Sequence, residues 1–260
     1  MSPWAICLVG LATYAVLLTI VWVIQLFTRN AALVDVVWPA AIGIIGLEYA
    51  LAGDGPVGVR MLMAVLALAW ALRLSGYLAV RMRGKPEDSR YTAARESWGD
   101  KAALYMFGFF MFQALIGWIL ALPFLVIAYQ AEAPSLWMAL LGCVIWFVSV
   151  VGEGTADAQL RHFKEQPDNK GKVCREGLWY YSRHPNYFFE STHWLAYVPL
   201  AIGCTGWWWV TLISPMLMAW LLLKVSGVPT VDTKDASDKR EGHDEYMRTT
   251  NTFIPWPPSK

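Results

Sequence analysis

The sequence has little charge and no strong excess of either sign. Only 16% of its 260 residues are Asp, Glu, Lys or Arg, whereas 57% are hydrophobic, and this balance lies outside the range of soluble globular domains. The formal net charge is +1, which excludes a strongly basic nucleic-acid-binding chain and an acidic disordered chain. Any function that depends on charge must therefore come from local clusters of charged residues.

Cysteine is also sparse, with four residues and no spacing typical of a metal or redox site. Cys7, Cys143 and Cys204 lie within apolar runs, and Cys174 stands alone in a polar stretch. Without a CxxC or a mixed Cys/His spacing, the sequence predicts no ligands for zinc, haem or an iron–sulfur centre. It implies no disulfide framework either.

Long apolar runs and 15 Trp, 11 Tyr and 11 Phe, typical of membrane interfaces, predict an all-α integral membrane protein. The first run, Trp4–Phe27, is longer than a signal-peptide core and predicts a retained helix, not a cleaved leader. Runs of spanning length follow at about 31–52, 58–80, 104–128 and 135–152. A run from about 188 to 224, broken at Gly203 and Gly206, is long enough for two helices. We therefore predict about seven transmembrane helices in a single domain, residues 1–260.

Basic residues gather on one side of this predicted bundle, in two loops and in the tail. They are Arg81, Arg83, Lys85, Arg90, Arg95 and Lys101; Arg161, Lys164, Lys170, Lys172, Arg175 and Arg183; and Lys224, Lys234, Lys239, Arg240 and Arg248. The opposite connections carry only Arg60, Asp54 and Glu132. An N-terminus outside and a C-terminus in the cytoplasm satisfy the positive-inside rule for every loop. Cytoplasmic loops of this kind suit a polyanionic soluble ligand, although each residue taken alone fits equally well a rim that binds lipid head groups.

The polar stretch after the fifth predicted helix holds the first candidate site residues. Asp157, Arg161 and Lys164 recur at helical spacing, so one helix face presents a carboxylate and two cations. An Asp–Arg pair that only solubilises the helix end is the alternative. Further along, Pro185 places Asn186 near a helix start, where backbone donors favour anions.

Glu190 follows Asn186 by one helical turn and should lie within the membrane. An ionisable residue at that depth is a functional candidate by default, because a partner or a ligand must compensate its desolvation.

Four segments together resemble the steroid 5α-reductase-like family (3-oxo-5α-steroid 4-dehydrogenase C-terminal domain), in its bacterial branch. They are Gly177–Glu190, with its Arg-His-Pro-Asn-Tyr core, the preceding Asp157-x-x-x-Arg161, the upstream Arg83–Tyr91 and the ending Phe253–Trp256. The resemblance covers most of the chain. The Arg-His-Pro element alone also occurs in membrane methyltransferases of the isoprenylcysteine carboxyl methyltransferase type.

The resemblance implies a seven-helix enzyme of the bacterial inner membrane that binds NADPH from the cytosol. Such an enzyme delivers hydride to the double bond of an apolar enone, a 3-oxo-Δ4 steroid or a related isoprenoid or lipid drawn from the bilayer. The implied cofactor-binding residues are Arg83, Lys85, Asp157, Arg161, Lys164, Lys172, Arg183, Asn186, Tyr187, Glu190 and Lys224. At Lys164, Lys172 and Lys224 the animal enzymes tend to have Arg, which binds phosphate in a bidentate manner.

Hydride addition to an enone builds negative charge on the carbonyl oxygen, so the site needs a proton donor and the exclusion of water. The polar side chains within the predicted helices are Asp35, Glu48, Tyr49, Arg73, Tyr77, His193 and Tyr197. Animal reductases hold the carbonyl with a Gln-Glu pair and a Tyr, which implies Glu48 and Tyr77 as the catalytic residues here, although the Gln is absent. Glu48 facing water and Tyr77 as an interface anchor are the alternatives, and for Asp35 we expect an ion pair with Arg73.

Two other functions fit parts of the sequence. An S-adenosylmethionine-dependent membrane methyltransferase shares the Arg-His-Pro element but needs fewer basic residues, because its cofactor carries no phosphate. A non-enzymatic channel or lipid-binding protein is the third reading. The intramembrane carboxylates at Asp35 and Glu190 weigh against it.

Overall fold

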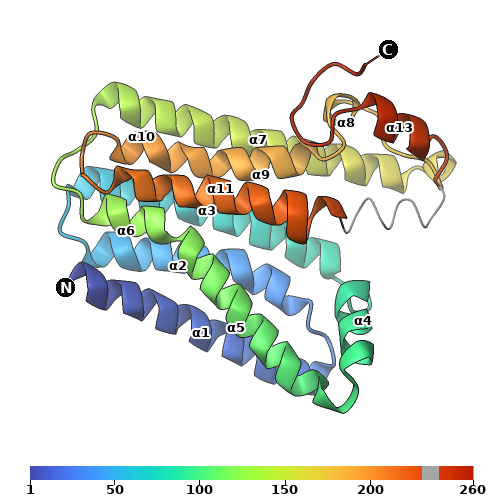
Figure 1. Ribbon diagram of the computed structural model, residues 1–260, viewed down its shortest axis with the longest axis horizontal. Helices are drawn as coiled ribbons and strands as arrows, with labels where there is room; N and C mark the ends of the chain where they lie inside the picture. Colours follow the sequence, from blue (N-terminus) through green and yellow to red (C-terminus); the bar gives the residue numbers. More distant parts are fainter. Residues whose placement is uncertain (230–239, 260) are drawn as a thin grey trace. The chain divides into compact units, whose positions relative to one another are not determined.

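The computed structural model describes residues 1–229 and 240–259, and its regular secondary structure is helical (Figure 1). Within these residues, six helical segments are long and apolar enough to cross a membrane: Pro3–Thr28, Leu33–Ala52, Val57–Met82, Ser89–Ala128, Leu136–Glu165 and Trp208–Val225. The predicted class, an all-α membrane protein, is confirmed. The predicted count of seven helices is not.

The difference in count arises between Pro185 and Ala201. This segment is helical, as α9 (Pro185–His193), η3 (Trp194–Ala196) and α10 (Tyr197–Ala201). It is shorter than the roughly 20 apolar residues that a spanning helix needs, and polar side chains occupy one of its faces. The last apolar run does divide where the glycines predict, because Gly203 adopts a positive φ of 77° in the turn that follows α10.

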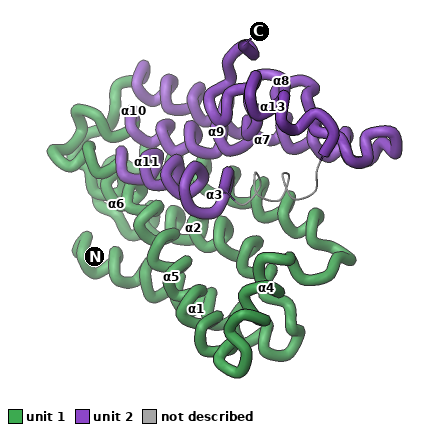
Figure 2. Tube along the Cα trace, turned by 45° about the vertical axis from the view of Figure 1, so that its right-hand side comes forward, with its two compact units in different colours: residues 1–135, 200–211 green, residues 136–199, 212–260 purple. Residues whose placement is uncertain are grey.

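The chain forms two compact units (Figure 2). Unit 1 comprises residues 1–135 and 200–211, and unit 2 comprises residues 136–199 and 212–260. The helices of the first stretch of unit 1 are α1 (Pro3–Thr28), α2 (Leu33–Ala52), α3 (Val57–Met82), α4 (Ser89–Trp98), η1 (Gly99–Lys101), α5 (Ala102–Leu120) and α6 (Leu122–Ala128). In addition to α9 and η3, unit 2 contains α7 (Leu136–Glu165), η2 (Pro167–Asn169), α8 (Leu178–Tyr181), α11 (Ile213–Trp220), the π-helical η5 (Leu221–Val225) and α13 (His243–Thr249). The chain changes from one unit to the other at three places: just before α7, within α10 and within η4 (Trp208–Leu212).

Helix α2 is the centre of unit 1 and packs against α1, α3, α5 and α6. Small residues let it approach α3 closely, since a Cβ on Gly43 would stand 2.6 Å from the Cβ of Ala71. Two side chains then tie three helices together. The Tyr14 hydroxyl of α1 donates to the Trp38 carbonyl at 2.6 Å, and the Trp38 indole donates to the Gln113 carbonyl of α5 at 3.0 Å.

The turn between α3 and α4 folds back onto the start of α2, and this corrects one expectation. The Asp35 carboxylate accepts hydrogen bonds from Arg90 at 2.8 Å and from the Tyr91 hydroxyl at 2.5 Å, in place of the predicted pair with Arg73. Asp35 lines one pocket with Leu78, more than one helical turn beyond Arg73 along α3. The sequence did not predict the Asp35–Arg90 pair because the two residues are 55 positions apart and only the fold of the turn between α3 and α4 brings them together.

The same contacts predict a stability effect. Replacing Asp35 with alanine leaves the hydroxyl of the buried Tyr91 without its acceptor, which typically costs 1–3 kcal/mol. We expect the apparent Tm of the detergent-solubilised protein to fall by about 3–10 °C. The control is Asp100→Ala, an exposed carboxylate in η1. A shift no larger than that of the control would show that the Asp35 contacts contribute little to stability.

In unit 2, helix α7 lies alongside the segment formed by α9 and η3. Gly152 makes this close approach possible, because a Cβ there would stand 2.6 Å from the ring of Phe189. The described residues after 239 pack on the region around α8. Their first contact is an isolated parallel bridge between Lys172 and Glu241.

Candidate functional site

A stripe of buried polar side chains runs along the contact between α7 and α9. On α7, Ser149, Glu153 and Asp157 follow one another at intervals of four residues and therefore share a face. Polar residues also recur on α9 and α10, at intervals of four, three and four positions: the partly buried Asn186 and the buried Glu190, His193 and Tyr197. Polar groups in such numbers seldom occupy the interior of an apolar helix pair unless they have a function.

The end of the stripe near the polar loops is formed by Asp157 and Asn186. The Asn186 side-chain amide donates to the Asp157 carboxylate at 3.2 Å, while its oxygen accepts the N–H of Tyr187 at 3.0 Å. Pro185 begins α9, so Asn186 is the second residue of the helix, where backbone N–H groups are not used within the helix. The Tyr187 ring stacks on His184, with a centroid distance of 5.2 Å and an interplanar angle of 4°. The structure thus brings together Asp157, Asn186 and Tyr187 from the predicted set.

Deeper along the stripe lie an acid and a histidine–tyrosine pair. Glu190 is buried, and its carboxylate accepts the indole N–H of Trp194 at 3.4 Å. His193 and Tyr197 are both fully buried, and the His193 Nε2 lies 3.3 Å from the Tyr197 hydroxyl. The distance from Asn186 to Tyr197 along the helix is about 16 Å, since 11 residues each rise 1.5 Å.

The predicted cations occupy different surroundings. Arg161 and Lys164 are exposed on α7, one and two turns beyond Asp157. Lys172 is exposed beside the bridge to Glu241, and Lys224 is exposed in η5.

Arg183 differs from these cations because it is buried and contacts the C-terminal segment. Its guanidinium donates to the Met247 sulfur and to the Thr252 hydroxyl, and its backbone N–H donates to the Asn251 carbonyl at 2.9 Å. The structure therefore places the Arg183 guanidinium in contact with Met247 and Thr252 of the C-terminal segment.

Unit 1 contains the two predicted catalytic residues but does not bring them together. Glu48, near the end of α2, is partly buried and accepts a hydrogen bond from Thr13 of α1 at 2.9 Å. Tyr77 lies near the end of α3, which runs antiparallel to α2. Because Gly43 lies level with Ala71, Glu48 and Tyr77 are about 16 Å apart along the hairpin.

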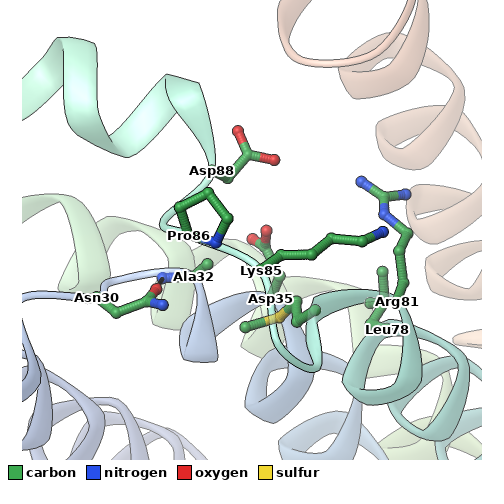
Figure 3. Close-up of a pocket in the computed structure, with 9 residues that line it drawn as sticks. Asn30, Ala32, Asp35, Leu78, Arg81, Lys85, Pro86 and Asp88 are labelled. Atoms are coloured by element: carbon green, nitrogen blue, oxygen red, sulfur yellow. Dashed lines mark hydrogen bonds between the residues drawn. The ribbon is translucent and has the colours of Figure 1, made fainter.

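The predicted basic turn after α3 borders a pocket of about 200 Å³ at the start of α2 (Figure 3). Lys85 lines it and extends toward Arg81, whereas Arg83 is exposed at the end of α3. The carboxylates of Asp35 and Asp88 lie at the same pocket. Burial alone would raise the pKa of Asp88, but hydrogen bonds from Arg90 outweigh it and lower this pKa. The pocket therefore combines charges of both signs.

Comparison with known proteins places the chain in a family. Residues 21–250 match the family described as a protein of unknown function, DUF1295. The chain belongs to the DUF1295 family. An uncharacterized protein of Schizosaccharomyces pombe is 27% identical over 278 positions, which cover 95% of this chain and 79% of the yeast protein. No solved structure matches the chain.

The DUF1295 match extends over every predicted site residue, from Glu48 to Lys224, and over Tyr246 of the tail. Because neither the family nor the yeast relative has an assigned activity, the function has to be argued from the site of this DUF1295 protein. In the parts of the chain that the structure describes, no three His, Cys, Asp or Glu side chains are grouped so as to hold a metal ion.

One residue of the stripe was not predicted from the sequence as a candidate site residue. Glu153 is only 4% exposed and lies one turn deeper than Asp157 on the same face of α7. The signal was present, because Glu153 follows the apolar run 135–152 directly and precedes Asp157 by four residues. Applying the rule for intramembrane carboxylates to α7 as well as to α9 would have found it.

Proposed function

We propose that this chain is an NADPH-dependent membrane reductase, which transfers hydride to the double bond of an apolar enone such as a 3-oxo-Δ4 steroid or a related isoprenoid or lipid. The observation that carries the proposal is the buried stripe of unit 2, in which the Asp157–Asn186 pair lies between exposed cations and the deeper Glu190. Carboxylates persist at such depth when they contact a ligand or transfer protons.

The chemistry of the stripe fits a cofactor with phosphates at one end and a carboxamide at the other. Arg161, Lys164 and Lys172 are exposed cations suited to phosphate. The Asn186 amide has a second N–H besides the one it donates to Asp157, and this group can pair with a carboxamide. When bound, the cofactor would supply the hydride.

The same stripe offers a proton donor. Addition of hydride leaves negative charge on the substrate oxygen, which an acid in a dry site must neutralise. Glu190 and Tyr197 are about 10 Å apart along the helix, seven residues of 1.5 Å each. The Tyr197 hydroxyl would donate its proton to the oxygen, which gives an enol that tautomerises to the saturated ketone. His193, at 3.3 Å, would return to Tyr197 a proton that originates from solvent. The catalytic roles of Glu48 and Tyr77 stay predictions, and variants of both residues are compared with Tyr197 variants in the same assay.

The proposed orientation follows the basic residues. With the N-terminus outside and the basic segments in the cytoplasm of a bacterial inner membrane, the cofactor enters from the cytosol and the apolar substrate from the bilayer. Arg83, Lys85 and Lys224 lie in these basic segments and are the further predicted phosphate contacts.

Thermal stabilisation of the detergent-purified protein by NADPH, NADH and S-adenosylmethionine tests the proposal. A ligand that binds the native state raises its apparent stability, by about 2.7 kcal/mol at 100 times its Kd. Stabilisation by NADPH supports the reductase, and enones are then screened by the loss of nicotinamide absorbance. Stabilisation by S-adenosylmethionine alone would overturn the proposal in favour of a methyltransferase.

Charge reversal at Arg161 tests whether this residue contacts the 2′-phosphate or the pyrophosphate of the cofactor. If Arg161 contacts the 2′-phosphate, Arg161→Glu should weaken NADPH binding by about 10- to 100-fold, with NADH affected much less, because only NADPH carries that group. The measurement is the Kd of each cofactor, and Lys101→Glu in unit 1 serves as the control for a change of net charge. Equal losses for both cofactors would place Arg161 on the pyrophosphate instead.

A further inference from the structure

The C-terminal segment, defined here as residues 243–256, is bound to the turn that precedes α9. Tyr246 of α13 is buried, and its hydroxyl lies 2.5 Å from the Trp179 carbonyl and 3.1 Å from the Ser182 carbonyl. Its ring is also covered by the Arg175 guanidinium, with 5.5 Å between the Arg175 Cζ and the ring centroid. One side chain of the C-terminal segment therefore contacts the second residue of α8 and the residue that follows this one-turn helix.

Ser182 transmits this attachment to α9. It is fully buried, its hydroxyl donates to the Phe253 carbonyl at 2.8 Å, and the same oxygen accepts the N–H of His184 at 3.1 Å. His184 is the residue that precedes Pro185 at the start of α9. The backbone between α8 and α9 is thus held on one side by the tail.

The contacts of the segment concentrate on this turn. The Arg183 N–H donates to the Asn251 carbonyl at 2.9 Å, and the Trp256 N–H donates to the Tyr181 carbonyl at 2.9 Å. Together with the Tyr246 and Ser182 contacts, they hold the chain at Trp179 and at the three consecutive residues Tyr181, Ser182 and Arg183, shortly before Asn186. A segment that only covered the polar surface would not need buried hydrogen bonds to the backbone of one turn.

From these contacts we infer that Tyr246 and Ser182 are positioning residues for the cofactor site: the C-terminal segment sets the start of α9 and so the orientation of Asn186 toward Asp157. The inference rests on the proposed function for the identity of the ligand. The positioning itself does not depend on it. A displacement of about 1 Å at such a site is sufficient to impair binding or catalysis.

Tyr246→Phe is the decisive variant, because it removes one hydroxyl and keeps the buried ring. We expect NADPH to bind about tenfold more weakly, as one lost hydrogen bond of about 1.4 kcal/mol implies. Amide hydrogen exchange in residues 178–186 should accelerate, which reports the positioning without any ligand. The control is Tyr180→Phe, which makes the same chemical change at an exposed ring of α8.

Ser182→Ala provides a second variant, in case Tyr246→Phe does not fold. Faster exchange in residues 178–186 with weaker NADPH binding supports the inference. Unchanged exchange and affinity in both variants overturns it. If the wild-type chain does not bind NADPH, the proposed function fails, and the exchange measurement alone then decides whether the tail positions α9.

Discussion

Replacing Asn186 with alanine is expected to raise the Kd for NADPH by about 100-fold while the protein stays folded. The variant removes the amide that pairs with Asp157 and that lies at the start of α9. A hydrogen bond to a charged group contributes about 1.5–3 kcal/mol, and the lost ligand contact adds to this effect. The measurement is the NADPH titration, followed by thermal stabilisation.

Glu190→Gln tests the deeper half of the same site without creating a cavity. The amide keeps an oxygen that can accept the Trp194 N–H but removes the ionisable carboxyl group. Glu165→Gln is the matched control, because Glu165 is an exposed glutamate at the end of α7. If Asn186→Ala and Glu190→Gln both bound NADPH with wild-type affinity, the stripe would not be the cofactor site.

The second large effect is expected at Tyr197. Tyr197→Phe removes the hydroxyl that contacts His193 and keeps the fully buried ring. General acid catalysis typically contributes 10²- to 10⁴-fold, so kcat for enone reduction should fall by about 100-fold or more. The Kd for NADPH should stay within about twofold, because Tyr197 is well beyond the cofactor residues along the helix.

Parallel variants decide between the candidate donors. Tyr77→Phe and Glu48→Gln are assayed under the same conditions, and Tyr105→Phe, an exposed tyrosine of α5, is the control for the chemical change. A wild-type kcat for Tyr197→Phe together with a large loss for Tyr77→Phe would move the donor to α3. This outcome would leave the cofactor site on the stripe unaffected.

The sequence predicted most of the helices, because their signal is local. The run Trp4–Phe27 corresponds to α1 within a residue or two, and the predicted break at Gly203 is present. The predicted run from about 188 to 224 included most of the segment Pro185–Ala201, but the apolar residues of this segment are interleaved with the polar residues of the stripe. Average hydropathy does not separate such a segment from a helix that faces lipid.

Site residues were predictable where their signal was periodic and unpredictable where their partners were distant. Asp157 and Asn186 were identified from local spacing, and the structure places them in contact. The partners of Arg183 are 64 and 69 residues away in sequence, and Asp35 pairs with Arg90 across 55 residues. No local pattern encodes such pairings, so the sequence did not show that Arg183 contacts Met247 and Thr252.

The attachment of the tail also has a consequence for biogenesis. Synthesis proceeds at roughly 5–20 residues per second, so the 64 residues between Arg183 and Met247 take several seconds to appear after Arg183 itself. During that interval α7 is already present and α9 is synthesised. The residues of the C-terminal segment that form hydrogen bonds to the turn before α9 have not yet been synthesised. The start of α9 is therefore complete only after Trp256 has been synthesised, and a chain released before that residue would insert its helices without it.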